Sequence, residues 1–118
     1  MAGIVAAGLN AYVTGFTTVA VYASLHTADP GTGGTSEVTG GSYTRESISW
    51  GAASAGTAAS DAPIVFDVPG STTITHLGYW SAVSGGTFYG SRALDTSQTY
   101  ATDGTYTIAT GNLSESVA

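Results

Sequence analysis

The chain has no cysteine and no lysine, and its 118 residues include only two cations, Arg45 and Arg92. Without cysteine there is no disulfide, no thiolate metal ligand and no cysteine nucleophile. Nucleic-acid binding needs clustered cations against phosphate, and anionic membrane surfaces attract basic segments that this sequence lacks. The composition therefore predicts neither a nucleic-acid partner nor a membrane partner.

Charge of either sign is scarce. Charged residues make up 8% of the chain and the net charge is −6, whereas about a quarter of an average soluble domain is charged. Hydrophobic residues still make up 42%, and 17 glycines with many serines and threonines fill the rest. Disordered chains combine low hydrophobicity with high charge, so this composition indicates a folded domain. A surface with few charges suits close packing against other protein copies.

Long apolar runs are also missing. No stretch approaches the roughly 18 apolar residues that span a bilayer, and the apolar start from Met1 to Gly8 has no basic residue of the kind that opens a secretion signal. We therefore expect a soluble chain that is made in the cytoplasm. Its length suits one domain.

Residues 1–16 are expected to form a short helix or an extended arm. Apolar residues recur there at partly helical spacings, but Gly3, Gly8 and Gly15 each weaken an isolated helix by about 1 kcal/mol relative to alanine. The segment should therefore become ordered by docking, either on its own domain or on another copy. Residues 17–118 are expected to form a single β-sandwich domain.

The remaining chain alternates apolar and polar residues as β-strands do. Strands are predicted over residues 17–25, 42–50, 63–68, 72–80, 87–94, 98–102 and 105–109, and residues 51–60 show no periodicity. Two turn signals, Ser84-Gly85-Gly86 and Asp103-Gly104, predict hairpins between neighbouring strands. Seven or eight short strands at this spacing predict an all-β fold, an antiparallel, jelly-roll-like β-sandwich.

Two of these strands have clear faces. Over 63–68 the residues Ile64, Phe66 and Val68 are expected to point inward. Over 72–80, Leu77 and Tyr79 are expected on one face, opposite Ile74, His76 and Trp80.

A tight turn is expected at Asp29-Pro30-Gly31, between the first strand and a glycine-rich loop. Aspartate can bond the backbone ahead of it, proline presets φ, and glycine accepts a positive φ.

Two histidines, His26 and His76, raise the question of catalysis. No Gly-x-Ser-x-Gly nucleophile segment accompanies them, and nothing suggests that Asp61 and Asp67 share a cleft as paired acids would. Each histidine is expected to hydrogen-bond backbone or threonine hydroxyls. We therefore predict no catalytic residue, no enzyme activity and no cofactor.

Metal binding is not expected either. Calcium prefers oxygen-rich loops, but the loop acids Asp29, Glu37, Asp95 and Asp103 do not form a dense Asp-x-Asp-x-Asp pattern. The two histidines lack the close spacing of a zinc site.

Aromatic residues crowd the later strands and suggest a protein interface. Adjacent pairs such as Tyr79-Trp80 and Phe88-Tyr89 point to opposite faces, so one member of each pair should face outward or into a second layer. An outward aromatic favours a protein interface, with plain amphipathic packing and sugar binding as the alternatives. Lone arginines on a neutral surface often anchor interfaces, and each is expected to pair either with a local acid, Glu46 or Asp95, or with an acidic patch on a neighbour. The candidate interface residues are Tyr43, Arg45, Tyr79, Tyr89 and Arg92.

Several ordered motifs resemble a family of small tailed-phage virion proteins, whose members are labelled tail-fibre, minor tail or head-decoration proteins. The resemblance covers about residues 20–113 and rests on these segments: Tyr22-Ala23-Ser24-Leu25-His26-Thr27-Ala28-Asp29-Pro30-Gly31, Glu37-Val38, Gly40-Gly41-Ser42-Tyr43, Arg45, Trp50-Gly51-Ala52-Ala53-Ser54 and Thr75-His76-Leu77-Gly78-Tyr79-Trp80-Ser81-Ala82.

The resemblance implies a structural component of the virion, made in the host cytoplasm. We expect a capsid decoration or minor capsid protein that binds the major capsid protein from outside, as an oligomer such as a trimer. The alternative is a minor tail or tail-fibre protein, whose partners are tail proteins or a host glycan. A secreted hydrolase or lectin is a third interpretation, which the missing signal peptide and nucleophile motif disfavour.

Overall fold

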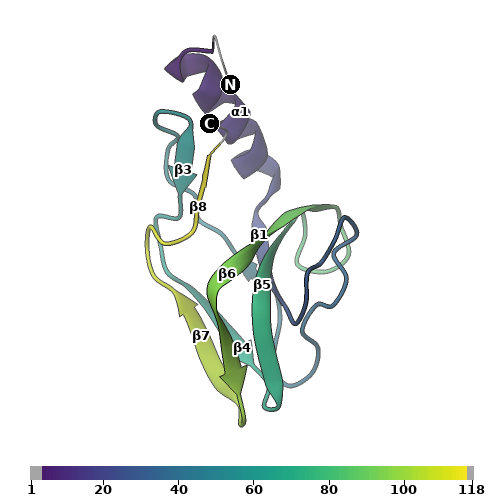
Figure 1. Cartoon of the computed structure of the whole chain (residues 1–118). Coiled ribbons are helices and arrows are strands. Elements are labelled where there is room, and N and C mark those ends of the chain that lie inside the picture. Colours follow the sequence, from purple (N-terminus) through teal and green to yellow (C-terminus); the bar gives the residue numbers. More distant parts are fainter. Residues whose placement is uncertain (1–3, 117–118) are drawn as a thin grey trace.

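The computed structural model describes residues 4–116, which form one helix and eight short antiparallel strands (Figure 1). This confirms the predicted fold class. Residues 1–3 of the predicted N-terminal segment and residues 117–118 of the predicted sandwich domain lie outside the described residues. Within residues 4–116, no helix is long and apolar enough to cross a membrane.

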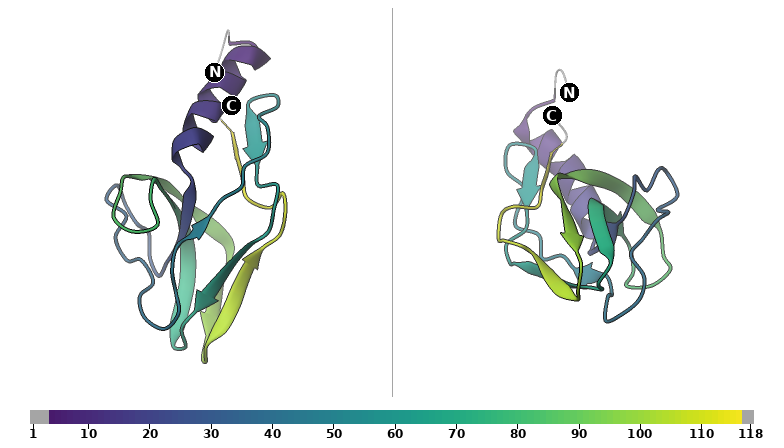
Figure 2. Two further views of the ribbon diagram at one scale, coloured as in Figure 1. Left: turned by 180° about the vertical axis from the view of Figure 1, so that it is seen from behind. Right: turned by 60° about the horizontal axis from the view of Figure 1, so that its bottom comes forward.

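The strands form one larger sheet and two ribbons. The larger sheet has the order β2-β1-β5-β6, and the ribbons are β4-β7 and β3-β8. The β4-β7 ribbon faces the larger sheet, while α1 leaves the end of this body beside the β3-β8 ribbon (Figures 1 and 2). The elements are α1 (Ala6–Val19), β1 (Tyr22–His26), β2 (Glu46–Ser47), β3 (Thr57–Ala59), β4 (Ile64–Val68), β5 (Thr72–Trp80), β6 (Phe88–Tyr100), β7 (Gly104–Ile108) and β8 (Ser114–Ser116).

The core lies between the β4-β7 ribbon and the larger sheet. As predicted, Ile64, Phe66 and Val68 of β4 are buried while the residues between them are exposed. Leu77 of β5 lies in the same core. Ile74 lies there too, which corrects its predicted place on the opposite face: the register shifts between Ile74 and His76, and such an irregularity reverses the alternation.

The last residues of β5 are buried on both faces of the strand. Tyr79 joins the main core, and Trp80 is covered on the other side by the glycine-rich loop, where Gly34 lies so close that a Cβ would be 2.6 Å from the indole. Gly34 has φ +74°, so glycine meets both the steric and the conformational demand there. The predicted turn before it is confirmed, since the Gly31 N–H donates to Asp29 Oδ1 at 2.9 Å.

Helix α1 includes residues 17–19, which the alternating sequence pattern predicted as the start of a strand. It continues to Val19, so the first strand begins at Tyr22 instead of residue 17. Val13 is buried on the helix, and Phe16 packs edge-on against Tyr79 at a centroid distance of 5.2 Å. Tertiary packing of this kind outweighs the cost of glycine and the β-branched residues near the helix end.

Other strand boundaries also differ from the prediction. Within 42–50 only Glu46–Ser47 is a strand, and the irregular segment before it carries Tyr43 and Arg45, which point inward and bond Glu37. The segment 51–60, predicted as a connector, contains β3, which pairs with β8 far along the chain. The segments 87–94 and 98–102 form the single strand β6.

Only one of the two predicted hairpins forms. Ser84-Gly85-Gly86 lies in the loop that joins the antiparallel strands β5 and β6, as predicted. Asp103-Gly104 instead carries the chain across to the other sheet, where β7 pairs with β4. Asp103 Oδ1 accepts a hydrogen bond of 2.8 Å from the Gly70 N–H, in the loop that joins β4 to β5. This bond holds the two crossing loops side by side.

Candidate functional site

The five predicted interface residues do not gather on one surface. Tyr43 and Arg45 point into the fold, where Tyr43 packs parallel to Phe66 and the Arg45 side chain is 9% exposed. Tyr79 is 2% exposed. Tyr89 is exposed on β6, and Arg92 is partly exposed on the same strand. Only Tyr89 and Arg92 remain candidates for an interface of the folded chain.

Arg45 is the centre of a polar cluster inside the fold. Its guanidinium pairs with Glu37 through Nη2–Oε1 and Nε–Oε2, both 3.0 Å, and lies 3.6 Å from the centroid of the Trp80 ring. It also donates to the carbonyls of Ala82 (3.0 Å) and Gly85 (2.9 Å). Arg45 therefore fastens the β5–β6 loop to the loop that carries Glu37.

The arginines pair with acids 8 and 23 residues away along the chain, which corrects the predicted local partners Glu46 and Asp95. Arg45 pairs with Glu37, and Arg92 pairs with Glu115 of β8 at 3.4 Å. The hydroxyl of Tyr43 donates to Glu37, and that of Tyr79 donates to Glu115. Sequence reasoning missed Glu37 and Glu115 because the fold, not the chain order, brings these groups together.

His26 lies in a buried series of hydrogen bonds that runs from Trp80 through Ser24 and His26 to the Thr35 backbone. The Thr35 carbonyl can only accept, so His26 Nδ1 donates to it at 2.8 Å and Nε2 accepts from Ser24 Oγ at 2.7 Å. Trp80 Nε1 donates to the same Ser24 Oγ at 2.9 Å. The bond to the Thr35 backbone confirms the structural role predicted for this histidine. His76 likewise bonds the Thr75 hydroxyl, at 2.8 Å.

The Ser24–His26 pair has the spacing of a nucleophile and its base, but no substrate can reach it. Both side chains are fully buried. A Cβ added at Gly78 would lie 2.5 Å from Ser24 Oγ, so the strand backbone closes the remaining side. A nucleophile must contact the atom that it attacks. The pair is therefore a packing element of the sheet.

The burial of His26 predicts an acid-sensitive fold. Burial lowers the pKa of His26 below its ordinary value of 6.5, while its bond to Thr35 and the charge of Glu37 partly oppose this. Below pH 6.5 the unfolded chain takes up a proton that the folded chain refuses, so folding stability is complete above that pH and falls as the pH drops. The loss is at most about 1.4 kcal/mol per pH unit for one group.

Urea unfolding between pH 7.5 and 5 measures this loss. A His26→Gln variant, although less stable at every pH, should lose less stability than the parent chain between these pH values. Equal losses in the two proteins would contradict a role for His26.

The acidic and histidine side chains are dispersed over the fold. Within residues 4–116, no three histidine or acidic side chains lie close enough to hold one ion together.

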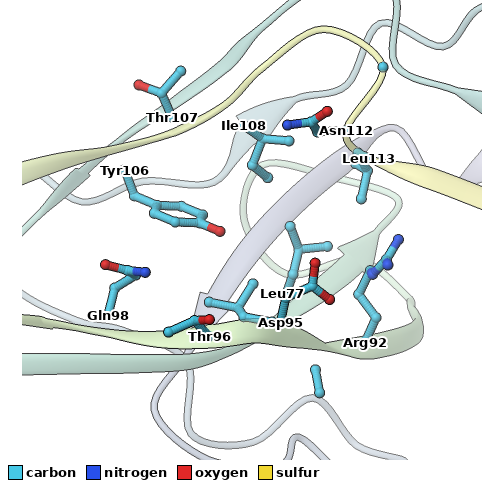
Figure 3. Close-up of a pocket in the computed structure, with 13 residues that line it drawn as sticks. Leu77, Arg92, Asp95, Thr96, Gln98, Tyr106, Thr107, Ile108, Asn112 and Leu113 are labelled. Carbon is cyan, nitrogen blue, oxygen red and sulfur yellow. The ribbon is translucent and has the colours of Figure 1, made fainter.

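A cleft of about 540 Å³ opens between β6 and β7, the edge strands of the two facing sheets (Figure 3). Leu77, Ile108 and Leu113 form an apolar floor. Polar side chains from β6, β7 and the turn before β8 surround it: Arg92, Asp95, Thr96, Gln98, Tyr106, Thr107 and Asn112. The Tyr106 hydroxyl points toward the middle of the cleft in Figure 3.

The surface of α1 carries no charged side chain, and apolar residues are exposed along it. Val5, just before the helix, Tyr12 and Val19 are exposed by 74%, 53% and 37%. They stand seven residues apart and form one stripe along the helix, which we call the α1 stripe, with Gly8 and Gly15 between them. The first charged residue of the chain is Asp29. The spacing of Val5, Tyr12 and Val19 can be read from the sequence. It was not recognised as a helix stripe because the glycines weaken the helical pattern and Val19 also fits the predicted strand.

The body of the molecule holds α1 firmly. The indole N–H of Trp50 donates to the Ala20 carbonyl at 2.8 Å, directly after the helix. Asn10 Oδ1 accepts a bond of 2.8 Å from the Gly56 N–H, beside β3. The molecule is elongated, 48 × 27 × 23 Å, and α1 extends along its long direction (Figure 2).

Comparison with protein families shows a match to the family described as podophage GP4 fiber I protein gp80, over residues 6–116. A search of curated proteins found no match. The family match corrects the expected capsid decoration or minor capsid function, because it supports the alternative of a tail-fibre protein and says nothing of a capsid partner. It also agrees with the expected virion component. The chain therefore belongs to the podophage GP4 fiber I protein family, a family of phage tail-fibre proteins.

Proposed function

We propose that this chain is a structural subunit of a tail fibre, that copies of it assemble through the α1 stripe, and that the β body faces outward. The observation that carries the proposal is the exposed apolar stripe on a charge-free helix at one end of an elongated molecule. The proposed function is structural, not enzymatic.

Charge favours α1 over the body as the place where copies meet. Each copy carries a net charge of −6, and all eight acids lie after residue 28. Like charges repel when identical surfaces approach one another. Residues 1–28 contain no acidic side chain, so copies can pack there without this repulsion.

The geometry of the α1 stripe suits packing between helices. Apolar side chains seven residues apart keep one face of a helix turned toward its partner. A Cβ added at Gly15 would have nothing within 4 Å, so the helix surface between Tyr12 and Val19 is open. A large side chain of a neighbouring helix, such as Tyr12, fits such an opening.

A substitution that introduces one charge into the α1 stripe tests whether copies assemble through α1. Tyr12→Asp places a carboxylate in the proposed helix contact, where burial of an unpaired charge is costly. We expect light scattering to show an oligomer, with a mass that is a multiple of 11.7 kDa, for the parent chain and a monomer for the variant.

Val65→Asp is the control, since Val65 is an apolar residue on β4, outside α1, and is 48% exposed. It should leave the mass unchanged. A monomeric parent chain, or equal masses for the parent and Tyr12→Asp, would contradict assembly through α1.

A further inference from the structure

A groove of about 240 Å³ lies between α1 and β8, beside the α1 stripe. Its walls are Val13 and Phe16 of the helix and Glu115 and Ser116 of the strand. We propose that this groove binds Tyr12 of a neighbouring copy, with the ring against the helix residues and the hydroxyl bonded to Glu115. This inference deepens the proposed function and rests on it, because it names the contact that joins two copies at α1.

The body of the molecule holds both walls of the groove in place. α1 and β8 lie side by side at one end of the molecule (Figures 1 and 2). Tyr79 of β5 contacts both walls, since its ring packs edge-on against Phe16 and its hydroxyl donates to Glu115. Arg92 of β6 adds an ion pair of 3.4 Å to the same carboxylate. The groove therefore exists before a neighbour arrives, and binding does not have to order its walls.

The lining of the groove matches the side chain of a tyrosine. Val13 and Phe16 offer an apolar surface, and aromatic rings pack favourably edge-to-face or offset against a ring such as that of Phe16. An apolar cavity of about 150 Å³ is enough to hold benzene, so the groove has room for a phenol ring.

Glu115 supplies the acceptor that a tyrosine hydroxyl needs. Both of its side-chain bonds, from Tyr79 and Arg92, end on Oε2, so Oε1 has no donor among residues 4–116. The Glu115 side chain is 31% exposed, which leaves Oε1 within reach of a neighbouring copy. A carboxylate can accept on both oxygens, and the fold already places one tyrosine hydroxyl on this one.

The tyrosine that fits comes from a second copy of this chain. All seven tyrosines lie within the described residues, and two of them, Tyr12 and Tyr89, are exposed. Tyr89 lies on the acidic body, where like charges keep copies apart. Tyr12 is 53% exposed, so it does not fill the groove of its own copy.

The position of Tyr12 brings it to the groove of the next copy. It stands four residues before Phe16, on the same helix face, so the α1 stripe and the groove adjoin each other. Copies related by rotation therefore bring the stripe of one against the groove of the next. The surface over Gly15 also admits the ring but gives it no walls, since nothing lies within 4 Å of a Cβ added there.

Photo-crosslinking tests the position of Tyr12. Benzoylphenylalanine in place of Tyr12 keeps an aromatic ring and reacts with the side chains that it touches. In a mixture of unlabelled and isotopically labelled copies, mass spectrometry distinguishes crosslinks between copies from crosslinks within one copy. We expect crosslinks between copies that join position 12 to β8.

Removal of the hydroxyl tests the bond to Glu115. Tyr12→Phe should raise the dissociation constant of the oligomer, measured by sedimentation, about tenfold, because one hydrogen bond to a carboxylate contributes about that factor. In a Glu115→Gln background the same change should have a smaller effect, since the charged acceptor is gone. Tyr89→Phe is the matched control and should leave the constant unchanged. Thermal melts establish that each variant folds.

Two results would overturn the inference: crosslinks between copies that never reach β8, or a Tyr12→Phe variant that associates as tightly as the parent chain. Either result in an intact oligomer contradicts the groove contact alone and leaves assembly through α1 standing. A monomeric parent chain contradicts the assembly itself, and light scattering detects that before any variant is made.

Discussion

Replacing Arg45 with methionine is expected to lower the free energy of unfolding by about 3 kcal/mol or more, since breaking a buried ion pair leaves an uncompensated charge. Methionine keeps most of the side-chain volume over Trp80 but removes every hydrogen bond. Glu37 loses its cation, and the carbonyls of Ala82 and Gly85 lose their donor. Urea unfolding measures the change.

Arg92→Met is the matched control. Arg92 also forms an ion pair, but its side chain is 38% exposed, and exposed pairs contribute only about 0–1 kcal/mol. Adding Glu37→Gln to Arg45→Met should restore part of the loss, because the unpaired carboxylate is then gone. Equal small losses in Arg45→Met and Arg92→Met would show that burial does not strengthen the Arg45 pair.

Replacing Phe66 with alanine should cost about 3–5 kcal/mol, the usual range for removing a buried aromatic side chain. Phe66 is fully buried at the centre of the core, and its ring lies parallel to that of Tyr43 at 6.5 Å. The alanine leaves a cavity between the β4-β7 ribbon and the larger sheet. The midpoint of urea unfolding reports the loss.

Val65→Ala on the same strand is the control for Phe66. Val65 is 48% exposed, so its truncation should change stability by only about 0.5 kcal/mol. A Phe66→Ala variant as stable as Val65→Ala would contradict the position of the core between the two sheets.

Strands whose own residues alternate between apolar and polar were predicted best, because that pattern can be read without knowing which strand pairs with which. β4 alternates strictly between buried and exposed residues, and β5 occupies the predicted range. β3 gave no signal because it is held by β8, more than fifty residues along the chain. Asp103-Gly104 has the composition of a hairpin turn, but the pairing of β7 with β4 decides its role.

The candidate sites were less predictable than the fold. Tyr43, Arg45 and Tyr79 look like surface residues in an alternating pattern, but loops and β8 cover them. Glu115 lies 36 residues after Tyr79, and Glu37 lies across a loop from Tyr43 and Arg45, so no regular strand or helix spacing identifies these pairs. The cleft depends on which strands end up at the sheet edges, and that is a property of the topology alone.

The measurement that tests the central claim most directly is an electron cryo-microscopy map of the phage tail that carries this chain. The proposal predicts α1 helices of neighbouring copies packed along Val5, Tyr12 and Val19 within a tail appendage, with the β bodies outside. A map in which α1 faces solvent, or in which the chain covers the capsid shell, would contradict it.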